Sequence, residues 1–213
     1  MTRPRSSGRS RSLRRDARLL LLAALVSLEA ACAGRLAVAP PAVVDQARRA
    51  PSYSARLRVS LKGPLLRART AVLVAFRRPD ALRIEVPGPA GARLVAVARG
   101  ERLWAVFPAE RAVFTGAARA DDLASLLGVA LSPSEVMELL VGAPPPRLRS
   151  YRAGWGPSLP REIRATLPDG ARLSVAVDDA EAPAVLGETA FAEPPHEGYR
   201  AITADQARTL WSR

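Results

Sequence analysis

The stretch YSARLRVSLKG, residues 53 to 63, decides the fold because apolar and polar side chains alternate along it. One face would carry its apolar members, Tyr53, Ala55, Leu57, Val59 and Leu61. The other face would carry Ser54, Arg56, Arg58, Ser60 and Lys62. A period of two is typical of a half-buried β-strand. The following Gly63-Pro64 would end this strand.

Five more short strands are predicted before residue 116. We expect them at about 68–77, 81–86, 93–99, 102–107 and 110–115. Short strands joined by tight turns favour an antiparallel meander. Two of these strands, with the sequences TAVLVAF (70–76) and LVAVA (94–98), are apolar on both faces. Such strands must be covered on both sides or must line an apolar space.

Two helices are predicted after the sixth strand. In ADDLASLLGV, residues 120–129, leucines recur at helical spacing, and two aspartates favour the helix N-terminus. The second helix is expected at 133–141, with Ser132 and Glu135 forming a capping box and Pro133 in the first turn. Gly142 and three prolines would end it.

The rest of the chain returns to strands. We expect these at about 147–154, 161–167, 171–178 and 184–192, with Asp169-Gly170 as a hairpin turn. Short helices are expected at 45–50 and 203–211. The whole pattern predicts a mainly β fold of about ten antiparallel strands with two apolar helices.

The N-terminus has the three parts of an export leader. Residues 3–18 hold seven arginines, residues 19–28 are almost wholly apolar, and Ala30 and Ala31 precede Cys32. The apolar run is about half of the roughly 20 residues that a spanning helix needs. We therefore expect residues 1–31 to be a signal peptide, 32–44 a tether and 45–213 a single domain.

Cys32 is the single cysteine of the chain, so it has no disulfide partner within it. The segment before it resembles the lipobox of bacterial lipoproteins, which implies cleavage before Cys32 and acylation of its thiol. Glu29 departs from that pattern, which prefers a small or β-branched residue at this position. Two alternatives stay open: Ala31-Cys32-Ala33 also fits an ordinary signal-peptidase site, and Cys32 can be a chance thiol in a discarded leader.

The charge of the chain has to be corrected for the leader. The formal net charge is +12, and residues 1–31, with seven arginines and two acidic residues, carry +5 of it. The remaining basic residues are spread along strands without a run of like charge, so nucleic acid is not an expected partner. A mildly basic surface fits either a neighbour of anionic lipid head groups or a solvated strand face.

The order of six strands, two helices and four strands resembles the LolA/LolB superfamily of lipoprotein carriers and receptors, and LolB-like lipoproteins most. The resemblance spans about residues 45–200. It is carried by LRIEVPGPAGARLVAVARGERLWAVFP (82–108), FTG (114–116), LLGVALSPSEVMELLVG (126–142) and LPREIRATLPDGARLSVAV (159–177). It implies an incomplete antiparallel β-barrel (a half-barrel) whose helical lid is inserted between strands six and seven.

The resemblance also implies a function and its sites. The protein would be anchored in the outer membrane on its periplasmic face, since Ala33 rather than Asp follows the cysteine. It would receive acylated lipoproteins, or another hydrophobic ligand, from a periplasmic carrier. Its apolar cavity and lid would consist of Leu57, Val59, Val74, Phe76, Ile84, Trp104, Leu123, Leu126, Leu127, Val136, Leu139 and Leu140. The loop that faces the membrane, with Pro87, Pro89 and Ala90, lacks the large apolar side chain found in LolB.

Nothing in the sequence indicates an enzyme. His196, the single histidine, lies in the turn-like segment EPPHEGY, and no cluster of residues has the spacing of metal ligands. No nucleophile-elbow, phosphate-loop or zinc-protease motif is present, and no cofactor is expected. The alternative function is a structural or assembly lipoprotein of the cell envelope that binds a protein partner through the same fold. The volume under the lid would distinguish the two.

Overall fold

The computed structural model describes residues 39–64 and 66–211. Cys32, the export leader and most of the expected tether lie outside these residues. The described residues belong to one compact unit, and all strand pairing and core packing reported below occur within it. Its elements are α2 (Pro41–Arg49), β1 (Ser52–Lys62), β2 (Arg67–Arg77), β3 (Ala81–Gly88), β4 (Gly91–Arg99), β5 (Arg102–Phe107), β6 (Ala112–Ala117), α3 (Ala120–Leu127), α4 (Pro133–Leu140), β7 (Ser150–Trp155), β8 (Pro160–Thr166), β9 (Arg172–Glu181), a 3-10 turn η1 (Glu188–Phe191), β10 (Arg200–Ala201) and α5 (Ala204–Trp211).

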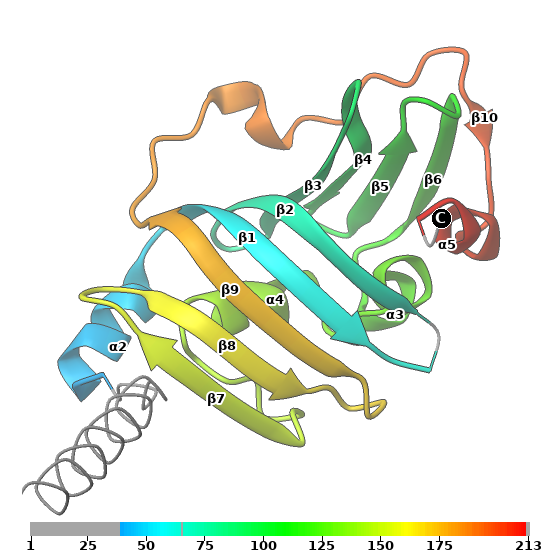
Figure 1. The fold of residues 1–213 in the computed structure, drawn as a ribbon. Coiled ribbons are helices and arrows are strands. Elements are labelled where there is room, and N and C mark those ends of the chain that lie inside the picture. The colour runs from blue at the N-terminus through cyan, green and yellow to red at the C-terminus, as the bar shows by residue number, and fades with distance from the viewer. Residues whose placement is uncertain (1–38, 65, 212–213) are drawn as a thin grey trace, which may run out of the picture. The chain divides into compact units, whose positions relative to one another are not determined.

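The ten strands form one sheet in the order β10-β6-β5-β4-β3-β2-β1-β9-β8-β7. Every neighbouring pair is antiparallel except β10 and β6, which are parallel. The edge strands β7 and β10 do not pair with each other, so the sheet stays open (Figure 1). The predicted incomplete barrel of about ten strands, with helices α3 and α4 between the sixth and seventh, is confirmed.

The sheet forks between β2 and β3. These strands pair only where Leu73–Arg77 lies opposite Ala81–Glu85. The first part of β2, residues 67–72, pairs with β1 on its other side but with no residue of β3. Figure 1 shows β1 and β2 diverging from β3 and β4 beyond the paired part. The fork leaves a gap in the ladder that side chains and helices have to fill.

The main core lies on one face of the sheet, here called the inner face. The apolar members of β1 point to this face, as the alternation predicted, and α3 and α4 pack against it. Tyr53 is fully buried there and stacks on Phe76, with 5.2 Å between ring centroids. The opposite, outer face carries the polar members of β1, of which Arg56, Arg58 and Lys62 are exposed.

The strand predicted at 184–192 is wrong. This segment instead crosses the outer face and forms η1 beside β3 and β4 (Figure 1). Its carbonyls accept hydrogen bonds from arginine side chains of the sheet, from Arg77 to Leu186 (3.2 Å) and from Arg83 to Ala190 (3.4 Å). Prolines at 183, 194 and 195 flank this segment, and because a proline has no N–H to donate, they limit how far a ladder could extend on either side.

Several boundaries differ from the predicted ones, and two of the differences have a clear structural reason. Helix α2 begins at Pro41, four residues before the expected start, because proline fits the first helical position. The loop expected at 87–92 is shorter, since β3 and β4 pair as far as Gly88 and Gly91 and leave Pro89-Ala90 as the turn. Among the described residues, no helix has the length and apolar character required to span a membrane.

Candidate hydrophobic binding site

A small apolar cavity of about 100 Å³ lies between the inner face and the two helices. It occupies the region of the fork, because its lining comes from both β2 and β3 as well as from β1, β9, α3 and α4. Thr70 is the one polar side chain of the lining, and its hydroxyl already donates to the carbonyl of Ala71 at 3.2 Å. The full lining is Leu57, Val59, Leu61, Ala68, Thr70, Val72, Val74, Ile84, Val86, Leu123, Leu127, Val129, Val136, Leu140, Leu173 and Val175.

Cross-strand register explains how the sheet builds this lining. Each inner-face residue of β1 lies opposite an inner-face residue of β2, as with Leu57 and Val72 or Leu61 and Ala68. On the other side of β1, Val59 lies opposite Val175 of β9. Side chains directly opposite each other stand about 4.5–5.5 Å apart at Cβ and pack together. The period of two therefore gathers residues from distant parts of the sequence into one apolar wall.

Eight of the twelve cavity and lid residues suggested by the family resemblance line the cavity: Leu57, Val59, Val74, Ile84, Leu123, Leu127, Val136 and Leu140. Phe76, Leu126 and Leu139 lie in the packed core beside it. Trp104 lies on the outer face, in a separate cluster with Val95 and Val97. The residues of β5 that face the main core are its neighbours Leu103 and Ala105.

Sequence reasoning missed several lining residues, and part of the missing signal was available. Leu61 belongs to the same alternating set as Leu57 and Val59, so period alone could have added it. Leu173 and Val175 alternate in the same way on β9. No comparable signal marks Ala68 or Thr70, because small and polar residues at the mouth of a fork look like ordinary strand residues.

The size of the cavity limits what it can hold as observed. An engineered apolar cavity of about 150 Å³ accommodates benzene, and drug-sized ligands occupy about 300–1,000 Å³. At about 100 Å³ the present cavity is smaller than either. An acyl chain needs more room than this, which movement of α3 or α4 away from the sheet would provide. The attachments of these two helices therefore decide what the site can do.

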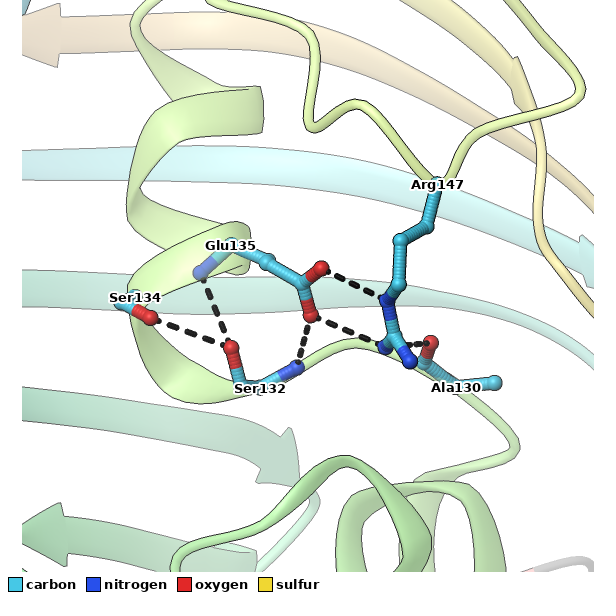
Figure 2. Close-up of polar contacts among 5 residues, drawn as sticks. All are labelled: Ala130, Ser132, Ser134, Glu135 and Arg147. Atoms are coloured by element: carbon cyan, nitrogen blue, oxygen red, sulfur yellow. Dashed lines mark hydrogen bonds and ion pairs between the residues drawn. The ribbon is translucent and has the colours of Figure 1, made fainter.

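Helix α4 begins with the predicted capping box, which is confirmed (Figure 2). The Ser132 hydroxyl accepts from the backbone N–H of Glu135 at 3.3 Å, and the Glu135 carboxylate accepts from the backbone N–H of Ser132 at 2.8 Å. Arg147 adds a two-pronged ion pair to the same carboxylate, at 2.9 and 3.0 Å, and donates to the carbonyl of Ala130. These contacts join the helix start to the segments on either side of it.

The pKa of the Glu135 carboxyl is the net result of opposing influences. Partial burial is the largest single one and would raise the pKa. The hydrogen bonds from Arg147 and Ser132, together with the positive charge of Arg147, outweigh burial and hold the pKa below its ordinary value. Glu135 is therefore ionised throughout the neutral range, which keeps the capping box and the ion pair formed together.

A second attachment holds α4 from its other side. Glu138 forms an ion pair with Arg78 at 2.7 Å and a longer one with Arg48 at 3.9 Å. Arg78 also donates to the carbonyl of Ala50 at 3.3 Å, and its guanidinium lies 5.5 Å from the ring centroid of Phe76. Helix α4 is thus tied to α2 and to the β2–β3 turn.

Helix α3 is attached in a different way. Arg119 at its N-cap makes no side-chain capping bond, although the Asp122 carboxylate accepts from the backbone N–H of Ala117 at 3.0 Å. The helix ends at Gly128, in the left-handed conformation with φ of 69°. Helix α5 packs against α3, and Arg208 donates to the carbonyl of Ser125 at 3.4 Å.

Two tyrosine hydroxyls are buried on the core side without a hydrogen-bond partner among the described residues, those of Tyr53 and Tyr151. Burial raises the pKa of both phenols, so both stay neutral. The remaining sequence candidates lie elsewhere. Pro87 is exposed near the end of β3, and Pro89 and Ala90 are exposed in the β3–β4 turn. His196 Nδ1 lies 2.9 Å from the carbonyl of Pro194, and no group of three His, Cys, Asp or Glu in the described chain could hold a metal ion.

Comparison with known proteins gives structural similarity only. No protein-family model matches the chain, and no curated protein matches it in sequence. A LolA superfamily protein from Nitrosomonas europaea is similar in structure, with a TM-score of 0.42 and 12% identity over 74% of this chain and 99% of that one. An uncharacterized conserved protein from Thermus thermophilus matches with a TM-score of 0.41 and 10% identity over 76% and 96%.

Proposed function

We propose that this protein is an outer-membrane lipoprotein, anchored through Cys32, that binds acyl chains of other lipoproteins and aids their localisation. The observation that carries the proposal is the cavity under α3 and α4, whose lining is apolar apart from Thr70. Such a lining suits a hydrocarbon chain, which has no polar group to satisfy. The driving force would be transfer of apolar surface, about 25 cal/mol per Å², with no covalent step and no cofactor.

Acyl binding requires that the cavity enlarge. The acyl chain of the ligand would displace α3 or α4. It would take the place of the leucine side chains that now fill the fork. A helix that buries only one face can move away from the sheet. Both helices meet this condition, because residues on the side away from the sheet, such as Asp121 and Ser134, are exposed. The occupied state would therefore keep the sheet and shift the helices.

The first test compares a fluorescent acylated peptide with its unacylated twin. Protein beginning at residue 33 should bind only the acylated form, measured by fluorescence anisotropy. Ala68→Phe would fill the cavity from β2 and should weaken binding at least tenfold. Ala71→Phe is the matched control, because it adds the same ring to the same strand on its exposed side. Equal binding of both peptides, or of neither, would reject the proposal.

The small size of the cavity favours a second candidate function. If the fork is filled permanently by the protein's own side chains, the domain is a structural or assembly lipoprotein that binds a protein partner. In that case neither peptide binds, and Ala68→Phe acts only on stability.

Anchoring is tested separately. We expect radiolabelled palmitate to be incorporated into the wild-type protein and to be absent from Cys32→Ser, with the protein recovered in the outer-membrane fraction. Incorporation that persists in Cys32→Ser would show that Cys32 is not the acylated residue.

A further inference from the structure

A row of three cations crosses the outer face at one end of the central strands. Lys62 of β1 lies directly opposite Arg67 of β2 and directly opposite Arg172 of β9. All three side chains are exposed, and Arg69 follows on the same face of β2. Like charges directly opposite each other destabilise a sheet. The row therefore has a cost that a stabilising partner outside the sheet would offset.

The acidic residues of this face do not neutralise the row. Glu162 bonds to Arg164 at 2.6 Å, Asp178 bonds to Arg58 at 2.8 Å, and Asp169 accepts from the backbone N–H of Ala171. No ion pair or hydrogen bond joins Lys62, Arg67, Arg69 or Arg172 to another side chain of the described residues.

Two further acidic residues of β9 lie toward the other end of that strand. At this opposite end of β9, Asp179 lies opposite Arg56 and Glu181 opposite Ser54, so these two carboxylates lie away from the cationic row. The row borders a broad surface hollow of about 1220 Å³, lined by five basic and two acidic side chains and by no aromatic one. An open, basic and non-aromatic hollow provides point charges for phosphate groups but no stacking surface for bases.

We propose that this cationic row is a docking face for an anionic phospholipid surface. Its side chains are exposed on the same face of three neighbouring strands, so several head groups can be met at once. Each Lys or Arg near such a surface contributes about 1 kcal/mol, which is roughly fivefold in affinity. This docking does not require that the inner-face cavity hold a ligand, because the row lies on the other side of the sheet.

The accessibility of this face can be measured at one residue, Lys62. Lys62 is the single lysine of the sequence, so amine acetylation of a side chain reports on the cationic row alone. The full chain is mixed with vesicles of phosphatidylcholine, with or without about one-third phosphatidylglycerol. Acetylation of Lys62 is then followed by mass spectrometry of its chymotryptic peptide. We expect several-fold slower acetylation on the anionic vesicles only, and a loss of this protection at high salt, where the Debye length falls to about 3 Å.

Two charge-removing variants distinguish the effect of the cationic row on vesicle binding from the effect of net charge. The triple variant Arg67→Gln, Arg69→Gln, Arg172→Gln should raise the lipid concentration for half-protection by on the order of a hundredfold. The control Arg99→Gln, Arg102→Gln, Arg152→Gln removes the same charge at exposed positions outside the hollow and should leave protection intact. Circular dichroism checks that both variants are folded.

Three outcomes would overturn the proposal. They are equal acetylation on both vesicle types, equal loss of protection in the control variant, and protection by inorganic phosphate or a double-stranded oligonucleotide at lower phosphate concentration than by vesicles. The last would assign the row to a free phosphate or to nucleic acid instead of a lipid surface.

Discussion

Helices α3 and α4 cover the same cavity, yet they are held by different kinds of interaction. Helix α4 has a complete capping box and ion pairs on two sides, through Arg147 and Arg78. Helix α3 has no side-chain N-cap and depends on apolar packing, on Gly128 and on α5. Polar contacts have narrow geometry, whereas apolar contacts can slide. If the cavity enlarges as proposed, this difference in attachment predicts that α3 is the helix that moves.

The largest effect should come from removing the apolar anchor of α3. Leu126 is fully buried, so Leu126→Ala loses its transfer free energy and leaves a cavity, which costs about 2–5 kcal/mol of unfolding free energy. Urea denaturation measures this cost. The control is Val185→Ala, at a side chain that is 94% exposed, and it should change stability by less than about 0.5 kcal/mol. Equal effects of the two would refute apolar anchoring of α3.

The end of α3 provides the next test. Gly128 has φ of 69°, and a Cβ there would lie 2.9 Å from Leu61 Cδ2 and 3.0 Å from Leu66 Cβ. Gly128→Ala should therefore cost about 1–3 kcal/mol, from backbone strain and crowding together. Gly187→Ala is the matched control, since a Cβ at that position meets no atom within 4 Å. Thermal unfolding of the two variants compares them.

Removing the cap of α4 should have a smaller effect. Ser132→Ala leaves the N–H of Glu135 without its side-chain acceptor and should cost about 1 kcal/mol. Ser134→Ala removes a nearby hydroxyl whose one described contact is with Ser132 Oγ, and should be close to neutral. Amide exchange should speed up in the first turn of α4 in Ser132→Ala only.

Adding the missing N-cap side chain should stabilise α3. Arg119 occupies an extended N-cap position without a capping bond, so Arg119→Ser adds an acceptor for the free N–H groups. We expect a gain of about 0.5–1 kcal/mol in unfolding free energy. If α3 is the moving helix, this variant should also bind the acylated peptide more weakly. Stabilisation with unchanged binding would instead assign the motion to α4.

The smallest effect should be the pH dependence of the Glu135–Arg147 pair. The pKa of Glu135 is lower in the folded chain than its ordinary value, so its stabilisation is complete above the ordinary pKa. It is lost as pH falls through the lowered, folded-state pKa. Arg147→Gln should flatten this part of the stability–pH curve measured by urea denaturation. Arg152→Gln, which removes an exposed charge on β7, should leave the curve unchanged.

Two local patterns made much of this fold predictable. The strict alternation of residues 53–62 fixed which side of β1 faces the core, and the structure has Leu57 and Leu61 buried there. The Ser132–Glu135 spacing fixed the start of α4, because a capping box is complete within four residues. Neither pattern depends on a distant partner, which is why each could be recognised from sequence.

The remaining features depend on distant contacts. In β5, Leu103 and Trp104 are both buried, so no alternation marks which face meets the main core. Residues 184–192 contain enough apolar side chains for a strand, but arginines of β2 and β3 bind their carbonyls. The fork that creates the cavity is set by where β2 and β3 stop pairing, and no residue in either strand signals that point.

The pairing of β1 with β9 also sets the order in which the chain can fold. Arg58 and Asp178, which bond across this pair, are separated by 120 residues. Because β1 and β2 are adjacent in the chain and β9 is distant, one edge of β1 has no partner until β9 reaches it. Contacts between such distant residues are slow to form, because a long loop must close before they are gained. In refolding, we expect amides of β1 to gain protection on the β2 side first and on the β9 side last.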